Sequence, residues 1–105
     1  MTISKEDNLL TLINTFTVAP ENQQELLDLL TQATQTVRTI PGFIASALHR
    51  SLDGTKVVMY AQWKSLENYN RMRANPSASP FLERALKIAT FQPGMFEVIE
   101  TFSAS

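Results

Sequence analysis

The chain has 105 residues, of which 44% are hydrophobic and 18% charged, so it can bury one core and is too apolar to be disordered. A net charge of -1 excludes the basic surface of a nucleic-acid-binding protein and a polybasic membrane patch. The chain has no cysteine, which excludes disulfides, thiolate nucleophiles and cysteine-based zinc sites.

Residues 1–8 are polar and mixed in charge, which predicts a flexible N-terminal tail and not a signal peptide. A single domain over residues 9–105 is expected to follow. No apolar run approaches the roughly 20 residues that a membrane span needs. We therefore expect a soluble, cytoplasmic protein without a membrane partner.

Residues 9–18 alternate between two faces and are rich in β-branched side chains, which predicts a strand. Asn14 is the one polar residue on the more apolar of these faces. A helix is predicted over residues 21–39, because Pro20 and Glu21 suit a first turn and leucines recur at steps of three and four. Pro41-Gly42 ends this helix.

Two further strands, residues 43–51 and 56–64, flank an Asp-Gly pair that is typical of a hairpin turn. Ser65 is a good N-cap for a helix over residues 66–74. Ser79 is predicted to cap a second helical piece that runs to about Thr90. The last predicted strand covers residues 95–102.

The order βαββαβ predicts an α+β, ferredoxin-like fold, in which a four-stranded antiparallel sheet carries helices on one face. Apolar side chains are expected on the other face as well, so that face needs a cover, and a homodimer that packs sheet against sheet supplies it. The candidates for this second face are Thr11, Ile13, Ile44, Leu48, Val58, Tyr60 and Ile99.

Few side chains could perform chemistry. No phosphate-binding glycine loop, carboxylate pair or histidine-rich metal set is present, so no metal site is predicted. The lone His49 has the pattern of a solvated surface residue more than of a base. Asn14, Met59 and Trp63 could share one cavity, roofed by Tyr69, whose composition suits a flat and mostly apolar ligand. The alternative is that Trp63 is plain core and that Asn14 bonds a neighbouring loop.

Five segments in order resemble the antibiotic biosynthesis monooxygenase family over residues 10–102. They are Ile13-Asn14-Thr15-Phe16, Pro20-Glu21, Pro41-Gly42-Phe43, Ser51-Leu52-Asp53-Gly54 and Tyr60-Ala61-Gln62-Trp63-Lys64-Ser65. The resemblance implies a homodimeric α+β barrel. It also implies a cofactor-free reaction, in which a deprotonated aromatic substrate reduces dioxygen directly.

By the same resemblance, Asn14 and Trp63 stand where catalytic pocket residues are expected, and Tyr69 matches a pocket tyrosine of some members. Met59 is a departure, because the polyketide oxygenases usually carry a second asparagine four residues before the tryptophan. The haem-degrading branch needs a histidine on the later helix, and residues 69–90 contain none. A branch of small barrels without a known reaction stays open.

We therefore expect a cofactor-independent monooxygenase-like enzyme for a small electron-rich aromatic or quinol, with no cofactor. Asn14 would hold the substrate oxyanion, and Trp63 would stack on the ring. Met59, Tyr69 and Gln62 would contact the substrate, the last only if the strand twists it inward. The alternative is a non-catalytic, small-molecule-binding or stress-related dimeric barrel.

Overall fold

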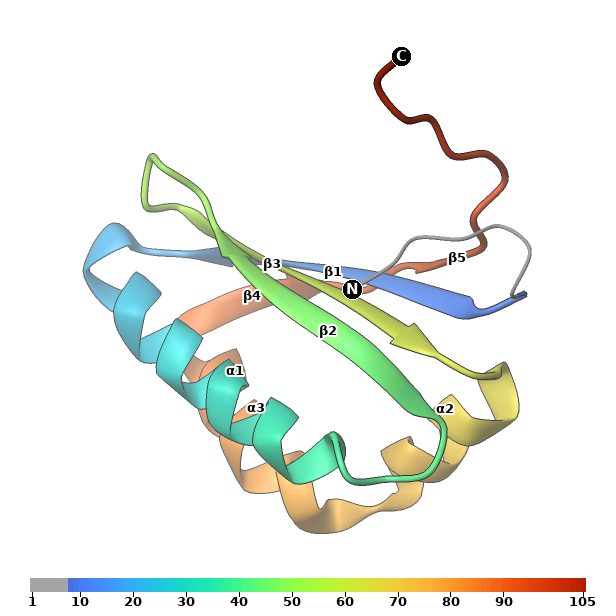
Figure 1. Cartoon of the computed structure of the whole chain (residues 1–105). Helices are drawn as coiled ribbons and strands as arrows, with labels where there is room; N and C mark the ends of the chain where they lie inside the picture. The colour runs from blue at the N-terminus through green and yellow to red at the C-terminus, as the bar shows by residue number, and fades with distance from the viewer. Residues whose placement is uncertain (1–7) are drawn as a thin grey trace.

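The computed structural model describes residues 8–105, in which three α-helices cover one face of an antiparallel sheet (Figure 1). The strands are β1 (Leu10–Val18), β2 (Phe43–Arg50), β3 (Lys56–Trp63), β4 (Ala89–Gln92) and β5 (Met95–Phe96). The helices are α1 (Gln23–Val37), α2 (Leu66–Ala74) and α3 (Ser79–Ile88), with short 3-10 helices η1 (Pro20–Asn22) and η2 (Pro76–Ala78). The predicted α+β, ferredoxin-like architecture is confirmed. The tail predicted over residues 1–8 lies almost wholly outside the described residues.

The strand order is β2-β3-β1-β4, and β5 also pairs with β1, so β1 lies at the centre of the sheet. The β2–β3 hairpin has the register set by its turn, where Gly54 adopts a φ of 81°. Asp53 stabilises this turn by accepting hydrogen bonds from the hydroxyls of Ser51 and Thr55 and from the Thr55 backbone.

The last strand differs from the prediction. Strand pairing begins earlier, at Ala89, and ends at Phe96, so residues 97–102 are not in a strand. Pro93 separates β4 from β5, because proline has no N–H to donate to the ladder with β1. Two large apolar residues beyond Phe96 are exposed: Ile99 retains 72% of its accessible surface and Phe102 retains 91%.

The predicted caps have mixed outcomes. Ser65 accepts a hydrogen bond from the Asn68 backbone and caps α2 as expected. Ser79 is instead the first residue of α3, and its side chain makes no cap. Asn75 does the capping at the break, where its side chain accepts from the Ser77 backbone and starts η2.

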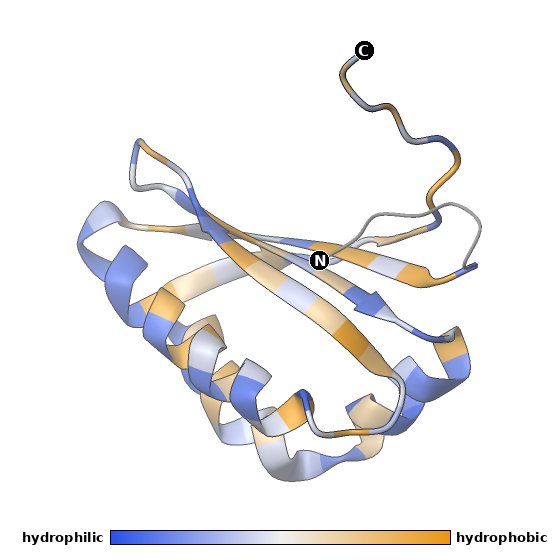
Figure 2. Ribbon diagram, in the orientation of Figure 1, coloured by the Kyte–Doolittle hydropathy of each residue, from blue (hydrophilic) through white to orange (hydrophobic). Residues whose placement is uncertain are grey.

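Two hydrophobic clusters lie between the sheet and the helices. The larger one joins β1 and β3 to α1 and α3 through Phe16, Val18, Leu26, Leu29, Leu30, Val57 and Ala85. The smaller one, at the other end of the sheet, has three buried members: Leu12, Ala61 and Trp63. In Figure 2, hydrophobic and hydrophilic residues alternate around the helices, as amphipathic packing requires.

The sheet face away from the helices carries Ile13, Val58 and Tyr60, as predicted; Ile13 is 36% exposed. Leu48 was wrongly expected there. It lies opposite Met59 in the register and packs against the larger cluster, so it faces the helices. Among residues 8–105, no helix is long and apolar enough to cross a bilayer.

Candidate active site

A cavity of about 390 Å³ lies between the sheet and the helices, at the end where the smaller cluster sits. That volume falls in the range of small-molecule sites. Its floor comes from β1 and β3, its roof from α2, η2 and α3, and one side from Phe91, Pro93 and Met95. Most of the lining is apolar or aromatic, and a few polar side chains interrupt it.

Asn14 is the polar residue on the floor. It is 9% exposed, and its Oδ1 accepts a long hydrogen bond of 3.4 Å from the Gly94 backbone N–H. Because a backbone N–H can only donate, this contact assigns the amide oxygen to Gly94 and leaves the Nδ2 donors free of any partner among the described residues. The amide oxygen of Asn14 therefore bonds a neighbouring loop, as the alternative interpretation predicted. Its NH2 group has no such partner.

Met59 is the direct cross-strand partner of Asn14, so both side chains lie on the cavity floor. A thioether thus stands next to the amide where the family resemblance implies a second amide. Trp63 lies four residues further along β3 and is 2% exposed. Its ring meets that of Phe43 edge-on, with centroids 5.4 Å apart, which fixes the indole as a rigid wall.

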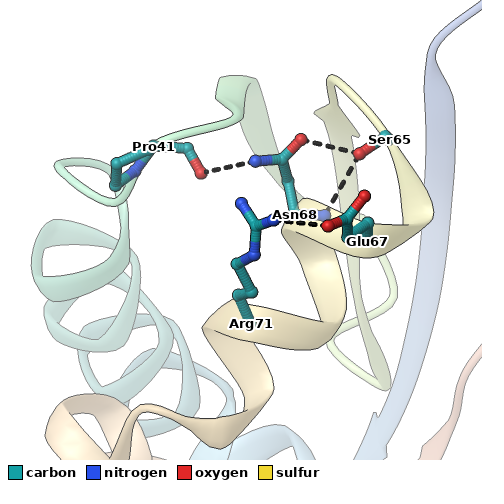
Figure 3. Close-up of polar contacts among 5 residues, drawn as sticks. All are labelled: Pro41, Ser65, Glu67, Asn68 and Arg71. Carbon is teal, nitrogen blue, oxygen red and sulfur yellow. Dashed lines mark hydrogen bonds and ion pairs between the residues drawn. The ribbon is translucent and has the colours of Figure 1, made fainter.

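Tyr69 contacts the other side of the indole, at a centroid distance of 6.0 Å, and lines the cavity from α2. The start of α2 is fixed by Asn68, which bonds the Ser65 hydroxyl and donates to the Pro41 carbonyl (Figure 3). Gly42 allows this approach, since a Cβ there would lie 2.3 Å from the Asn68 Cβ. The roof of the cavity is thereby tied to the loop before β2.

Gln62 does not join the others. Its cross-strand partner is Thr11, so it points to the sheet face opposite the cavity, where it is 1% exposed and its Nε2 has no partner among the described residues. The prediction that Gln62 contacts the substrate is therefore not supported, because β3 does not twist this side chain toward the cavity. His49 lies on that face as well, with Nδ1 3.3 Å from the Val58 carbonyl oxygen, and does not line the cavity.

Five polar residues that line the cavity were not predicted as site residues: Thr34, Ser46, Arg73, Asn75 and Ser79. Ser46 lines the cavity with a buried hydroxyl that has no partner in the described part of the chain. Nothing short of the β2 register could have placed it there. Arg73 lines the cavity from α2, four residues after Tyr69, and the i, i+4 spacing was a usable clue.

No aspartate, glutamate or histidine is among the described residues that line the cavity. No group of three or more metal-ligating side chains occurs within residues 8–105 either. Among residues 8–105, the one carboxyl with a clearly shifted pKa is that of Asp53 in the hairpin turn, where the hydrogen bonds from Thr55 lower it from 3.8 to about 2. The cavity thus offers hydrogen-bond donors and aromatic walls, and the described lining offers no general base.

The fold and the cavity define a ferredoxin-like α+β domain with a partly open, mostly apolar cavity between sheet and helices. A sequence model described as antibiotic biosynthesis monooxygenase matches residues 9–84. Tetracenomycin-F1 monooxygenase of Streptomyces glaucescens is 41% identical over 105 residues, which span 99% of this chain and 94% of that protein. The chain belongs to the antibiotic biosynthesis monooxygenase family.

Solved structures agree with this assignment. SnoaB, a cofactor-independent oxygenase from Streptomyces nogalater, has a TM-score of 0.82 at 25% identity, over 92% of this chain and 99% of that one. The monooxygenase ActVA-Orf6 of Streptomyces coelicolor, solved with the ligand nanaomycin D, has a TM-score of 0.82 at 28% identity, over 95% and 96%. Rv0793 from Mycobacterium tuberculosis, at 18% identity and a TM-score of 0.78, shares the fold.

Proposed function

We propose that this chain is a cofactor-independent monooxygenase that oxidises an electron-rich phenol or quinol with dioxygen. The observation that carries the proposal is the bonding of Asn14, a residue of the apolar cavity lining: its Oδ1 is held by Gly94, and its Nδ2 group has no partner among the described residues. Relatives that are described as monooxygenases or as a cofactor-independent oxygenase support it.

For a phenol, the proposed reaction balances with dioxygen alone. The ring carbon para to the hydroxyl loses its hydrogen and gains one oxygen atom as a carbonyl. The second oxygen atom leaves as water, with that hydrogen and the one from the hydroxyl. Asn14 would donate to the phenolate oxygen, and this stabilises the anion from which dioxygen takes electrons. Trp63 would hold the ring flat against the floor.

The substrate has to supply its own acidity, because the described cavity lining contains no carboxylate or imidazole. Met59 strengthens this requirement, since it provides no second donor beside Asn14. We therefore expect turnover to rise with pH as the substrate hydroxyl ionises. The midpoint should move when a more acidic phenol is used.

Ser46 is a second polar residue of the cavity lining, and a ligand would reach its buried hydroxyl only after a small shift of the neighbouring side chains. It lies on β2, with β3 between it and Asn14 on β1. Neighbouring strands are about 4.8 Å apart, so the two positions are separated by roughly 10 Å across the sheet. A fused aromatic system of two or three rings spans such a distance, which favours a polycyclic substrate over a single ring.

The test is oxygen consumption by the metal-free and flavin-free protein with a panel of anthrones and quinols. We expect turnover that Asn14→Ala lowers about 100-fold, the typical effect of losing one oxyanion donor. Trp63→Phe should lower it less. Asn70→Ala, on the exposed side of α2, is the matched control and should leave the rate unchanged.

No consumption with any substrate, or equal rates for the wild type and Asn14→Ala, would contradict the enzyme proposal. Ligand binding without oxygen uptake would instead favour the alternative of a non-catalytic binding protein. Met59 favours that alternative, because Asn14 is then the one amide that the two paired positions on β1 and β3 bring to the cavity.

We also propose that the chain forms a homodimer through the sheet face that carries Ile13, Val58 and Tyr60. None of the described helices covers this face (Figure 1), and exposed apolar residues of the C-terminal segment, Ile99 and Phe102, add to the surface that a partner could bury. Sedimentation at micromolar concentration should give the mass of two chains. A stable monomer would contradict this.

A further inference from the structure

One charged side chain stands among the described residues that line the cavity, and it is Arg73. The rest of the lining is apolar, aromatic or neutral and polar. Arg73 is also an exposed residue, so it belongs both to the cavity lining and to the outer surface. A lone cation at the entrance of an apolar site attracts one kind of ligand group, an anion.

Arg73 has no acidic partner among the described residues, and its one recorded contact is with Tyr69. The guanidinium carbon lies 5.9 Å from the centre of that ring, which is within the range of a cation–π contact. This contact brings no negative charge to the guanidinium, so its N–H donors can still bind an anion.

Arg71, two residues earlier on the same helix, shows the contrast. It is paired with Glu67, as Figure 3 shows, and it lines a shallow surface depression away from the cavity. The charge of Arg71 is therefore already compensated, whereas that of Arg73 is open to a ligand. Both arginines are exposed residues of one helix, so they form a natural pair for comparison.

We propose that Arg73, held by Tyr69, is a specificity determinant that binds an anionic oxygen group of the substrate, a carboxylate or an ionised phenol, at the mouth of the cavity. This rests on the proposed function, because the ligand is the substrate of the same cavity. The reacting ring would lie on the floor by Asn14 and Trp63, and the anionic group would lie at the α2 wall. An arginine fork can bind such a group through two parallel hydrogen bonds.

The test measures binding without turnover. Anthraquinone-2-carboxylate and anthraquinone-2-carboxamide are flat, already oxidised ligands that differ in charge. Trp63 is the only tryptophan of the chain, so the quenching of its fluorescence, checked by calorimetry, reports occupancy. The wild type should bind the carboxylate roughly five- to tenfold more tightly than the carboxamide, as expected for a partly exposed charged hydrogen bond.

Arg73→Gln should abolish this preference and leave carboxamide binding unchanged. Arg73→Lys should restore part of it, because the charge returns without the planar fork. Arg71→Gln is the matched control and should keep the full preference. A third ligand, 2-hydroxyanthraquinone, separates the two anion sources: tighter binding as its hydroxyl ionises identifies a phenolate site, and a preference confined to the carboxylate identifies a carboxylate site.

The proposal is overturned if the wild type binds both ligands equally or neither, or if Arg71→Gln and Arg73→Gln lose the preference alike. Its outcome is separate from that of the proposed function, since no ligand here is oxidised. With active protein and an anionic substrate, Arg73→Gln should raise KM and leave kcat unchanged. An oxygen electrode that reads no turnover would sink the monooxygenase proposal and leave the charge preference standing.

Discussion

The layer between the sheet and the helices is tightly packed at one end and contains the cavity at the other, although β1 and β3 run through both ends. At the closed end, defined by the larger cluster, α1 and α3 fill the space with fully buried side chains such as Leu26, Leu30 and Ala85. At the cavity end, defined by the smaller cluster and the cavity, α2 contributes no buried residue. One end stabilises the fold, and the other leaves room for a ligand.

The break at Asn75–Pro76 accounts for the difference. It divides the second helical region into α2 and α3, and only α3 continues alongside α1 (Figure 1). The polar groups follow the same division. Asn14 and Ser46 both belong to the cavity lining, and each has a donor that lacks a partner among the described residues. The packed core and the proposed binding cavity thus occupy different halves of one layer.

The largest expected effect comes from removing a side chain at the closed end. Leu30→Ala deletes a residue with no exposed surface and should lower the free energy of unfolding by about 2–5 kcal/mol. Met72→Ala, in the cavity roof, should cost less than Leu30→Ala, because Met72 is only partly buried and borders the cavity. Urea denaturation measures both, and equal losses would refute the division into two ends.

A backbone substitution tests how firmly the cavity roof is held. Gly42 has a φ of 97°, and a Cβ there would clash with Asn68 at the start of α2, so Gly42→Ala should cost about 2–3 kcal/mol. Gly54→Ala is the control, with a φ of 81° and a milder approach of 3.3 Å to Pro20; about 1–2 kcal/mol is expected. In thermal unfolding, a cavity ligand should raise the melting temperature of Gly42→Ala less than that of the wild type, whereas Gly54→Ala should respond like the wild type.

Ser46 offers a smaller effect of opposite sign. Its hydroxyl is buried and unpartnered in the described chain, so Ser46→Ala should raise the unfolding free energy by about 1 kcal/mol while weakening ligand binding. Thr34→Val is the matched control, because the Thr34 hydroxyl lines the same cavity but donates to the Leu30 carbonyl at 2.8 Å. It should bring no gain. A loss of stability in Ser46→Ala would mean that the hydroxyl is bonded.

The smallest effect concerns pH at the closed end. The folded pKa of Asp53, about 2, lies below its ordinary value of 3.8, so its hairpin bonds stabilise the ionised form. This contribution is fully present above pH 3.8 and is lost as pH falls through about 2. Asp53→Asn should therefore melt below the wild type at pH 5, and the gap should close near pH 2. A constant gap would place the cause elsewhere.

The periodicity of the sequence predicted the core residues but not every residue of the cavity lining. The alternation in β1 was enough to set Asn14 apart, and the helical stripe correctly included Leu26 and Leu30. The sequence did not settle which sheet face Gln62 occupies, because a shift of one residue along a strand moves a side chain to the other face. Its pairing with Thr11 in the structure places it on the face away from the cavity. The early start of the last strand was missed as well.

Local chemistry decided much of this protein without tertiary information. The Ser65 cap, the Asp-Gly turn and the break at Pro76 depend on bonds within a few residues, so the sequence alone determined them. Only the tertiary structure decided that Met59 lies opposite Asn14 and that Ser46 and Arg73 line the cavity. It also left Arg73 without an acidic partner among the described residues. These depend on register and helix placement, in which residues far apart in the chain meet, and no local interaction encodes them.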